Sequence, residues 1–185
     1  MENKATDLSK FKHELHLSFG AKLKYGVWLV ISNIFFLTNI PYPSSVKVYI
    51  LRLLGAQIGQ GCVIKPWVKI KLPWNLYIGD NVWLGESVWI DNISNVRIGS
   101  NVCISQKALL ITGNHDYSLP YFDLISKPIH VEEGVWICAN STITGGVTLK
   151  SHSVVGIGVI IKKDTSPFSI YGNKQEVTIK QREIK

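Results

Sequence analysis

One short segment of this 185-residue chain carries the residues best suited to catalysis. Asn114, His115 and Asp116 are consecutive there, and tyrosine, phenylalanine and aspartate residues follow them closely. The reference pKa of a histidine side chain lies near 6.5, so a neutral imidazole can take a proton at neutral pH. The segment therefore indicates proton transfer by His115, and a surface histidine without a role is the alternative.

The chain on both sides of this segment has a six-residue period. Three hexapeptides make one triangular coil of a parallel β-helix, in which neighbouring coils bury a continuous core. A β-sandwich with short strands is the alternative, but it gives no reason for a six-residue phase. With two-residue slips at 76–77 and 96–97, the aliphatic positions are Ile58, Ile64, Ile70, Ile78, Leu84, Ile90, Ile98, Ile104, Leu110, Val131, Ile137, Ile143, Leu149, Val155 and Ile161.

The histidine segment interrupts this period. A regular coil begun at Ile98 would be followed by one at residue 116, but the period resumes only at Val131, which leaves 131 − 116 = 15 extra residues. Long loops on a rigid scaffold commonly carry function. We therefore expect a protruding loop within residues 111–130 that presents His115.

The segment before the repeats is predicted to be helical. Residues 25–40 are almost wholly apolar, Pro41 and Pro43 break the run, and a second helix stops at Gly55. Such a hairpin can cover the open end of a β-helix. The run is shorter than the ~20 residues that span a bilayer, so peripheral membrane attachment is the alternative to capping and subunit packing. The predicted divisions are a helical cap at 1–55, a β-helix at 56–166 and a tail at 167–185.

The composition of the chain indicates which binding partners and which cellular compartment to expect. Three cysteines in no paired spacing favour a reducing, cytoplasmic environment over a disulfide framework. The start of the chain has no apolar run typical of a secretory signal. The net charge is +7, but the basic residues are spread along the chain, so we expect no nucleic-acid partner. A phosphate-rich cofactor or a phosphorylated substrate suits the same charge.

Several motifs resemble the hexapeptide-repeat acyltransferases, most closely the sugar O-acetyltransferases of the colanic-acid and exopolysaccharide type. They are residues 89–92 (WIDN), 98–105 (IGSNVCIS), 112–117 (TGNHDY), 131–149 and 154–164. The resemblance implies an all-β, left-handed parallel β-helix of about five coils. It also implies an acetyl-CoA-dependent O-acetyltransferase that acts on a sugar or saccharide precursor in polysaccharide biosynthesis. The family is usually a homotrimer with clefts between neighbouring coils.

The resemblance also suggests roles for individual residues. His115 matches the general base, and Asp91, Asn114 and Asp116 are candidates to orient it or to bind the acceptor; a plain turn residue is the alternative for Asp91. Contacts to coenzyme A are implied for Trp136, Ala139, Gly156, Ile157, Lys162 and Lys163, with a solvated lysine pair as the alternative for the last two. Two departures are Cys138, where the family usually has glycine, and residues 172–176 (GNKQE), where it often has GNPA.

Other functions remain open at this stage. An N-acetyltransferase of an amino-sugar nucleotide would use the same donor and base, and a β-helix can also be a non-catalytic scaffold. A metal-dependent hydrase would need three convergent histidines, and His115, His130 and His152 lack close metal-type spacing. We therefore expect no metal. Attachment at the inner membrane face is an alternative to a purely cytoplasmic location.

Overall fold

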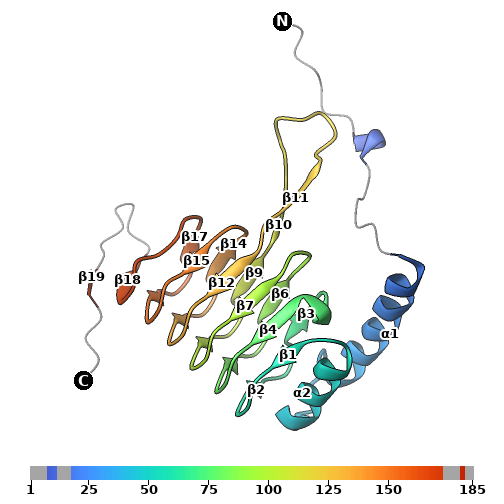
Figure 1. Cartoon of the computed structure of the whole chain (residues 1–185), viewed down its shortest axis with the longest axis horizontal. Coiled ribbons are helices and arrows are strands. Elements are labelled where there is room, and N and C mark those ends of the chain that lie inside the picture. The colour runs from blue at the N-terminus through green and yellow to red at the C-terminus, as the bar shows by residue number, and fades with distance from the viewer. Residues whose placement is uncertain (1–7, 12–17, 173–179, 182–185) are drawn as a thin grey trace, which may run out of the picture.

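The computed structural model describes residues 8–11, 18–172 and 180–181 and shows a β-solenoid with two helices at one end (Figure 1). Its short strands form three parallel sheets. Face A has the order β1-β4-β7-β12-β15, face B contains β2-β5-β8-β13-β16-β18, and face C contains β3-β6-β9-β14-β17. This arrangement confirms the predicted parallel β-helix with an N-terminal helical segment.

Each coil contributes one strand to each face. The first two coils contain β1 (Gln57–Ile58), β2 (Val63–Ile64), β3 (Lys69–Ile70), β4 (Leu76–Ile78), β5 (Trp83–Leu84) and β6 (Trp89–Asp91). The next two contain β7 (Val96–Ile98), β8 (Cys103–Ile104), β9 (Leu109–Ile111), β12 (Ile129–Val131), β13 (Trp136–Ile137) and β14 (Thr142–Thr144). The fifth contains β15 (Thr148–Leu149), β16 (Val154–Val155) and β17 (Ile160–Ile161). β18 (Ser169–Tyr171) adds the first strand of a further coil and pairs with β19 (Lys180–Gln181).

The aliphatic positions of the six-residue period form the core. On face A, Ile58, Ile78, Ile98, Val131 and Leu149 are in register, and all are buried. The residue after such a position is often glycine, because the next coil lies too close for a side chain. A Cβ on Gly99 would lie 2.8 Å from the backbone nitrogen of Glu133 in the next coil. Stacked coils therefore leave no room for a side chain at this corner.

The two slips of the period lie at the corner between face C and face A. The 3-10 helix η2 (Pro73–Asn75) occupies the first corner, and the second holds the buried Asn92. The Asn92 side chain accepts a hydrogen bond from the Leu72 N–H at 3.0 Å and donates one to the Leu72 carbonyl at 2.7 Å. Leu76 and Val96 themselves are buried in β4 and β7, so the extra residues precede them.

Two helices cover the first coil. α1 (Phe19–Phe35) and α2 (Ser44–Leu53) correspond to the predicted hairpin. An exposed strand edge carries unpaired carbonyl groups that would otherwise recruit another chain. The cap provides one donor to each face: Trp28 Nε1 to Ile70 O at 2.9 Å, Lys47 Nζ to Ile64 O at 3.2 Å, and Arg52 Nη2 to Ile58 O at 2.6 Å.

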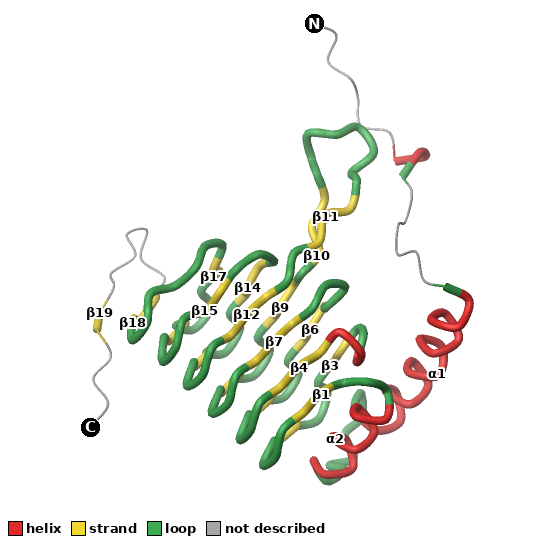
Figure 2. The backbone as a smooth tube through the Cα atoms, viewed as in Figure 1, coloured by secondary structure: helices red, strands yellow, loops and turns green. Residues whose placement is uncertain are grey.

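The predicted loop is present as an antiparallel hairpin. β10 (Gly113–His115) pairs with β11 (Leu124–Ser126), and the hairpin projects from the solenoid between coils three and four (Figure 2). A short 3-10 helix, η1 (Leu8–Lys10), directly precedes Phe11, whose ring contacts His115 on β10. Among the described residues, no helix is long and apolar enough to cross a membrane.

Candidate active site

His115 ends strand β10 on the exposed hairpin. Its Nδ1 lies 2.7 Å from the carbonyl oxygen of Phe122, on the returning limb of the same loop. A carbonyl oxygen can only accept, so Nδ1 must carry the proton of this hydrogen bond. The other ring nitrogen, Nε2, is then an acceptor. The hairpin thus holds the imidazole in the tautomer that a general base requires.

A pocket of about 370 Å³ adjoins His115. Asp91 and Lys71 line it from coils two and one, and Asn114 lines it from the hairpin. Asp91 is in register with Ile111 on β9, directly before the hairpin begins, so coil stacking brings its carboxylate to the histidine loop. The Lys71 Nζ lies 2.8 Å from Asp91 Oδ1, which forms an ion pair at the pocket wall. Among the predicted site residues, the pocket brings His115, Asn114 and Asp91 together.

The N-terminal arm reaches the same pocket. Phe11 lines it, and its ring contacts the His115 ring edge-on, with centroids 5.5 Å apart and an interplanar angle of 64°. Sequence reasoning missed Phe11, Lys71 and the Phe122 carbonyl. The first two belong to segments distant from the loop in sequence, and a backbone carbonyl has no residue signature.

Asp116 serves the loop itself. Its Oδ1 accepts hydrogen bonds from the Ser118 N–H at 2.9 Å and the Ser118 hydroxyl at 2.5 Å. These bonds, the side-chain one first, hold the pKa of the Asp116 carboxyl below its usual value. The Asp116 carboxylate therefore stabilises the turn, while the His115 ring is oriented by Phe122.

The predicted donor residues lie along the C-terminal coils. Trp136 is outward on face B, 46% exposed, and its Nε1 donates to the Ser105 hydroxyl at 3.0 Å. Ala139 and Ile157 lie at the corner between faces B and C on successive coils, where the Gly158 N–H donates to Ala139 O. The Gly156 N–H donates to Tyr171 O at 2.8 Å, and the Gly156 carbonyl accepts from the Ser141 hydroxyl at 2.8 Å, so both backbone groups already have partners within the chain.

Lys162 and Lys163 follow β17 at the opposite edge of face C and are exposed. Lys162 lines a pocket of about 450 Å³, together with Asn114, Lys127 and Thr144. Asn114 also lines the pocket beside Asp91, so the hairpin stem separates two openings. Within one chain, Ala139 and Ile157 thus lie at one edge of face C, and the hairpin and Lys162 lie at the opposite edge.

Cys138, one of the two departures from the family pattern, is a buried cysteine. Burial raises the pKa of the Cys138 thiol, and nearby Cys103 raises it further, which disfavours the reactive thiolate. Of the second departure, residues 172–176, only Gly172 is among the described residues. Within the described part of the chain, no group of three or more His, Cys, Asp or Glu could hold a metal ion.

Comparisons with known proteins identify the family. No protein-family model matches the chain. The chain is 31% identical over 176 residues to an Escherichia coli K12 protein named colanic acid biosynthesis acetyltransferase WcaF, covering 95% of this chain and 97% of the relative. The galactoside O-acetyltransferase of the same organism is 31% identical over 134 residues, which is 70% of this chain and 66% of the relative.

Solved structures agree with this assignment. A hexapeptide-repeat acetyltransferase from Vibrio cholerae, complexed with acetyl-CoA, matches with a TM-score of 0.79 at 22% identity, covering 95% of this chain and 96% of the other; at that identity the match shows the fold. A galactoside acetyltransferase in complex with coenzyme A matches with a TM-score of 0.73 at 26% identity, covering 84% and 78%. The fold is thus the left-handed β-helix that the family resemblance implied, and the chain belongs to the hexapeptide-repeat acetyltransferase family.

Proposed function

We propose that this protein transfers the acetyl group of acetyl-CoA to a hydroxyl group of a sugar or saccharide precursor in polysaccharide biosynthesis, with His115 as general base. The orientation of His115 carries this proposal. Because Nδ1 donates to Phe122, Nε2 can accept the proton of an acceptor hydroxyl in the adjoining pocket. The polar wall formed by Asp91, Lys71 and Asn114 suits a ligand with several hydroxyl groups.

The reaction follows from that geometry. Nε2 of His115 takes the hydroxyl proton while the acceptor oxygen attacks the thioester carbonyl carbon. The tetrahedral intermediate collapses, the carbon–sulfur bond breaks, and the acetyl ester of the sugar forms. The imidazolium of His115 then returns its proton to the coenzyme A thiolate. No covalent enzyme intermediate is needed, which agrees with the raised pKa of the buried Cys138 thiol.

The donor is expected to lie along the C-terminal coils. Its pantetheine arm would pass Trp136, Ala139, Gly156 and Ile157, and its phosphates would meet Lys162 or Lys163. These two groups lie on opposite edges of face C in one chain. We therefore propose a homotrimer, in which the corner of one subunit completes the site beside the hairpin of its neighbour. A fully active monomer in light scattering would contradict this arrangement.

The outer side of α1 supports a peripheral membrane contact. Phe19, Leu23, Val27, Val30 and Ile34 recur every three or four residues, and their exposed fractions range from 47% to 85%. The opposite side of this helix is apolar too, and an all-apolar helix is normally covered on both sides. Residues 15–79 contain seven Lys or Arg and no Asp or Glu. We propose that this surface lies on an anionic membrane, on the cytoplasmic side where acetyl-CoA is available.

A turnover assay against a panel of acceptors tests the function. Release of the coenzyme A thiol would be recorded with neutral sugars, nucleotide sugars and amino-sugar nucleotides. We expect turnover with hydroxyl acceptors that lack a free amine. Turnover only with free-amine acceptors would favour the N-acetyltransferase alternative, and a trimer that binds acetyl-CoA but acetylates no acceptor would favour a scaffold.

A further inference from the structure

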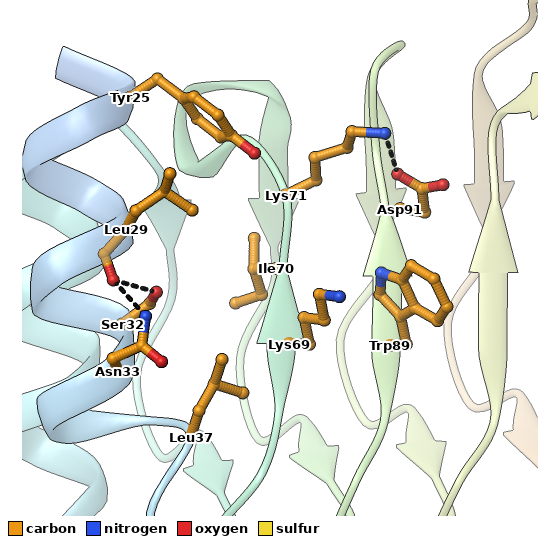
Figure 3. Close-up of a pocket in the computed structure, with 10 residues that line it drawn as sticks. All are labelled: Tyr25, Leu29, Ser32, Asn33, Leu37, Lys69, Ile70, Lys71, Trp89 and Asp91. Atoms are coloured by element: carbon orange, nitrogen blue, oxygen red, sulfur yellow. Dashed lines mark hydrogen bonds and ion pairs between the residues drawn. The ribbon is translucent and has the colours of Figure 1, made fainter. Parts of the chain in front are cut away.

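A second cavity lies next to the candidate active site. It has a volume of about 160 Å³ and lies between helix α1 and face C, between Tyr25 and Leu29 on the helix and Lys69, Ile70 and Trp89 on the sheet (Figure 3). Lys71 and Asp91 line both this cavity and the pocket beside His115. The two cavities are therefore neighbours that share one wall, the Lys71–Asp91 ion pair.

Aromatic and polar groups line this second cavity together. Trp89 is 40% exposed, and the Lys69 Nζ lies 4.4 Å from its ring centroid. In Figure 3 the Tyr25 hydroxyl, which can donate and accept hydrogen bonds, points toward Lys71. Asn33 uses its amide N–H to donate to Leu29 O at 2.7 Å, which leaves its carbonyl oxygen as an acceptor.

Such a lining suits a sugar ring. The apolar C–H face of a pyranose packs on an aromatic ring, and its hydroxyl groups need several donors and acceptors around the rim. Trp89 and Tyr25 supply the aromatic surfaces, and Lys69, Asn33 and Asp91 supply the polar groups. A wholly apolar ligand would cover the Lys69 ammonium and the Lys71–Asp91 ion pair without offering them hydrogen bonds in place of water, which is costly.

We propose that this cavity is a second saccharide subsite and that the acceptor therefore has at least two sugar units. One unit presents its hydroxyl group to His115, and the next lies between α1 and Trp89, across the Lys71–Asp91 pair. The proposal rests on the proposed function of the His115 pocket and extends it from a single sugar to an oligosaccharide acceptor. Ligand binding displaces the exposed Lys69 side chain from the face of Trp89.

Binding to a glycan array tests the subsite separately from catalysis. The full-length protein is applied to an array of monosaccharides and of the disaccharides and trisaccharides that contain them. The wild-type protein is expected to bind at least one disaccharide more tightly than its own terminal monosaccharide. Trp89→Ala is expected to reduce that preference about 3- to 10-fold, because one aromatic contact is lost.

Trp83→Ala is the matched control. Trp83 is 43% exposed on face B, and Lys65 lies 4.9 Å above its ring, so it repeats the Trp–Lys pair away from the cavity. The control is expected to bind as the wild type does. An array on which no disaccharide exceeds its monosaccharide, or on which the two variants behave alike, overturns the subsite. The proposed function fails by a different result, namely the absence of acetylated saccharide of any length.

Discussion

Replacement of His115 by alanine is expected to lower kcat by about 10²–10⁴-fold, because the acceptor hydroxyl loses its general base. This loss corresponds to about 2.7–5.5 kcal/mol in the activation free energy. The same substitution removes the exposed hydrogen bond from His115 to Phe122 O. One such bond contributes roughly 0.5–1.5 kcal/mol to the local structure, which accounts for about tenfold at most. The larger loss can therefore be attributed to chemistry.

Steady-state assays of acetyl-CoA turnover with the best acceptor measure this effect. Tyr117→Ala is the control for the loop, because Tyr117 is 88% exposed on the same hairpin and does not line the His115 pocket. His130→Ala is the control for histidine chemistry, because His130 lies in β12 on face A. Both controls should keep kcat within a few-fold of the wild-type value. A His115→Ala variant that falls within the same range would refute the general-base assignment.

Three further predictions concern the donor, the cap and the membrane. Lys162→Gln combined with Lys163→Gln should raise the KM for acetyl-CoA and weaken its salt dependence; an unchanged KM at low and moderate salt would show that both lysines are solvated bystanders. Burial lowers the pKa of Lys47 below its ordinary value of 10.5. At pH values between that lowered pKa and 10.5, the unfolded chain binds more protons at Lys47 than the folded chain does, so the free energy of unfolding rises with pH. In Lys47→Met, denaturation curves recorded at several pH values should show a smaller rise. Val27→Glu with Val30→Glu should abolish co-sedimentation with vesicles of phosphatidylcholine and phosphatidylglycerol, and wild-type protein that ignores these vesicles would contradict the membrane contact.

The repeat architecture could be predicted because its signal is local and redundant. Ile78, Ile98 and Val131 stack in one row of face A, and each is marked in sequence by its own hexapeptide. If the strand position is predicted wrongly in one coil, the hexapeptides of the next coil still give the correct position. The slips were harder to locate, because the buried Asn92 that fills one corner looks like an ordinary turn residue in the sequence.

The candidate site could be predicted only in part. His115 and Asn114 were found because the loop interrupts the period, and Asp91 because coil stacking places it one turn earlier. Phe11 could not be found, because its contact depends on how a separate arm folds back onto the hairpin. The Trp89 cavity depends on the position of α1 over face C, which no periodicity encodes.

The chemical identity of the product tests the central claim most directly. The wild-type protein would be incubated with acetyl-CoA labelled with ¹³C at the acetyl carbonyl and with an accepted saccharide, and the label would be located by NMR and mass spectrometry. An alkali-labile acetyl ester on a sugar hydroxyl, absent with His115→Ala, is the predicted result. An alkali-stable amide, or label retained on a cysteine of the protein, would contradict direct O-acetyl transfer.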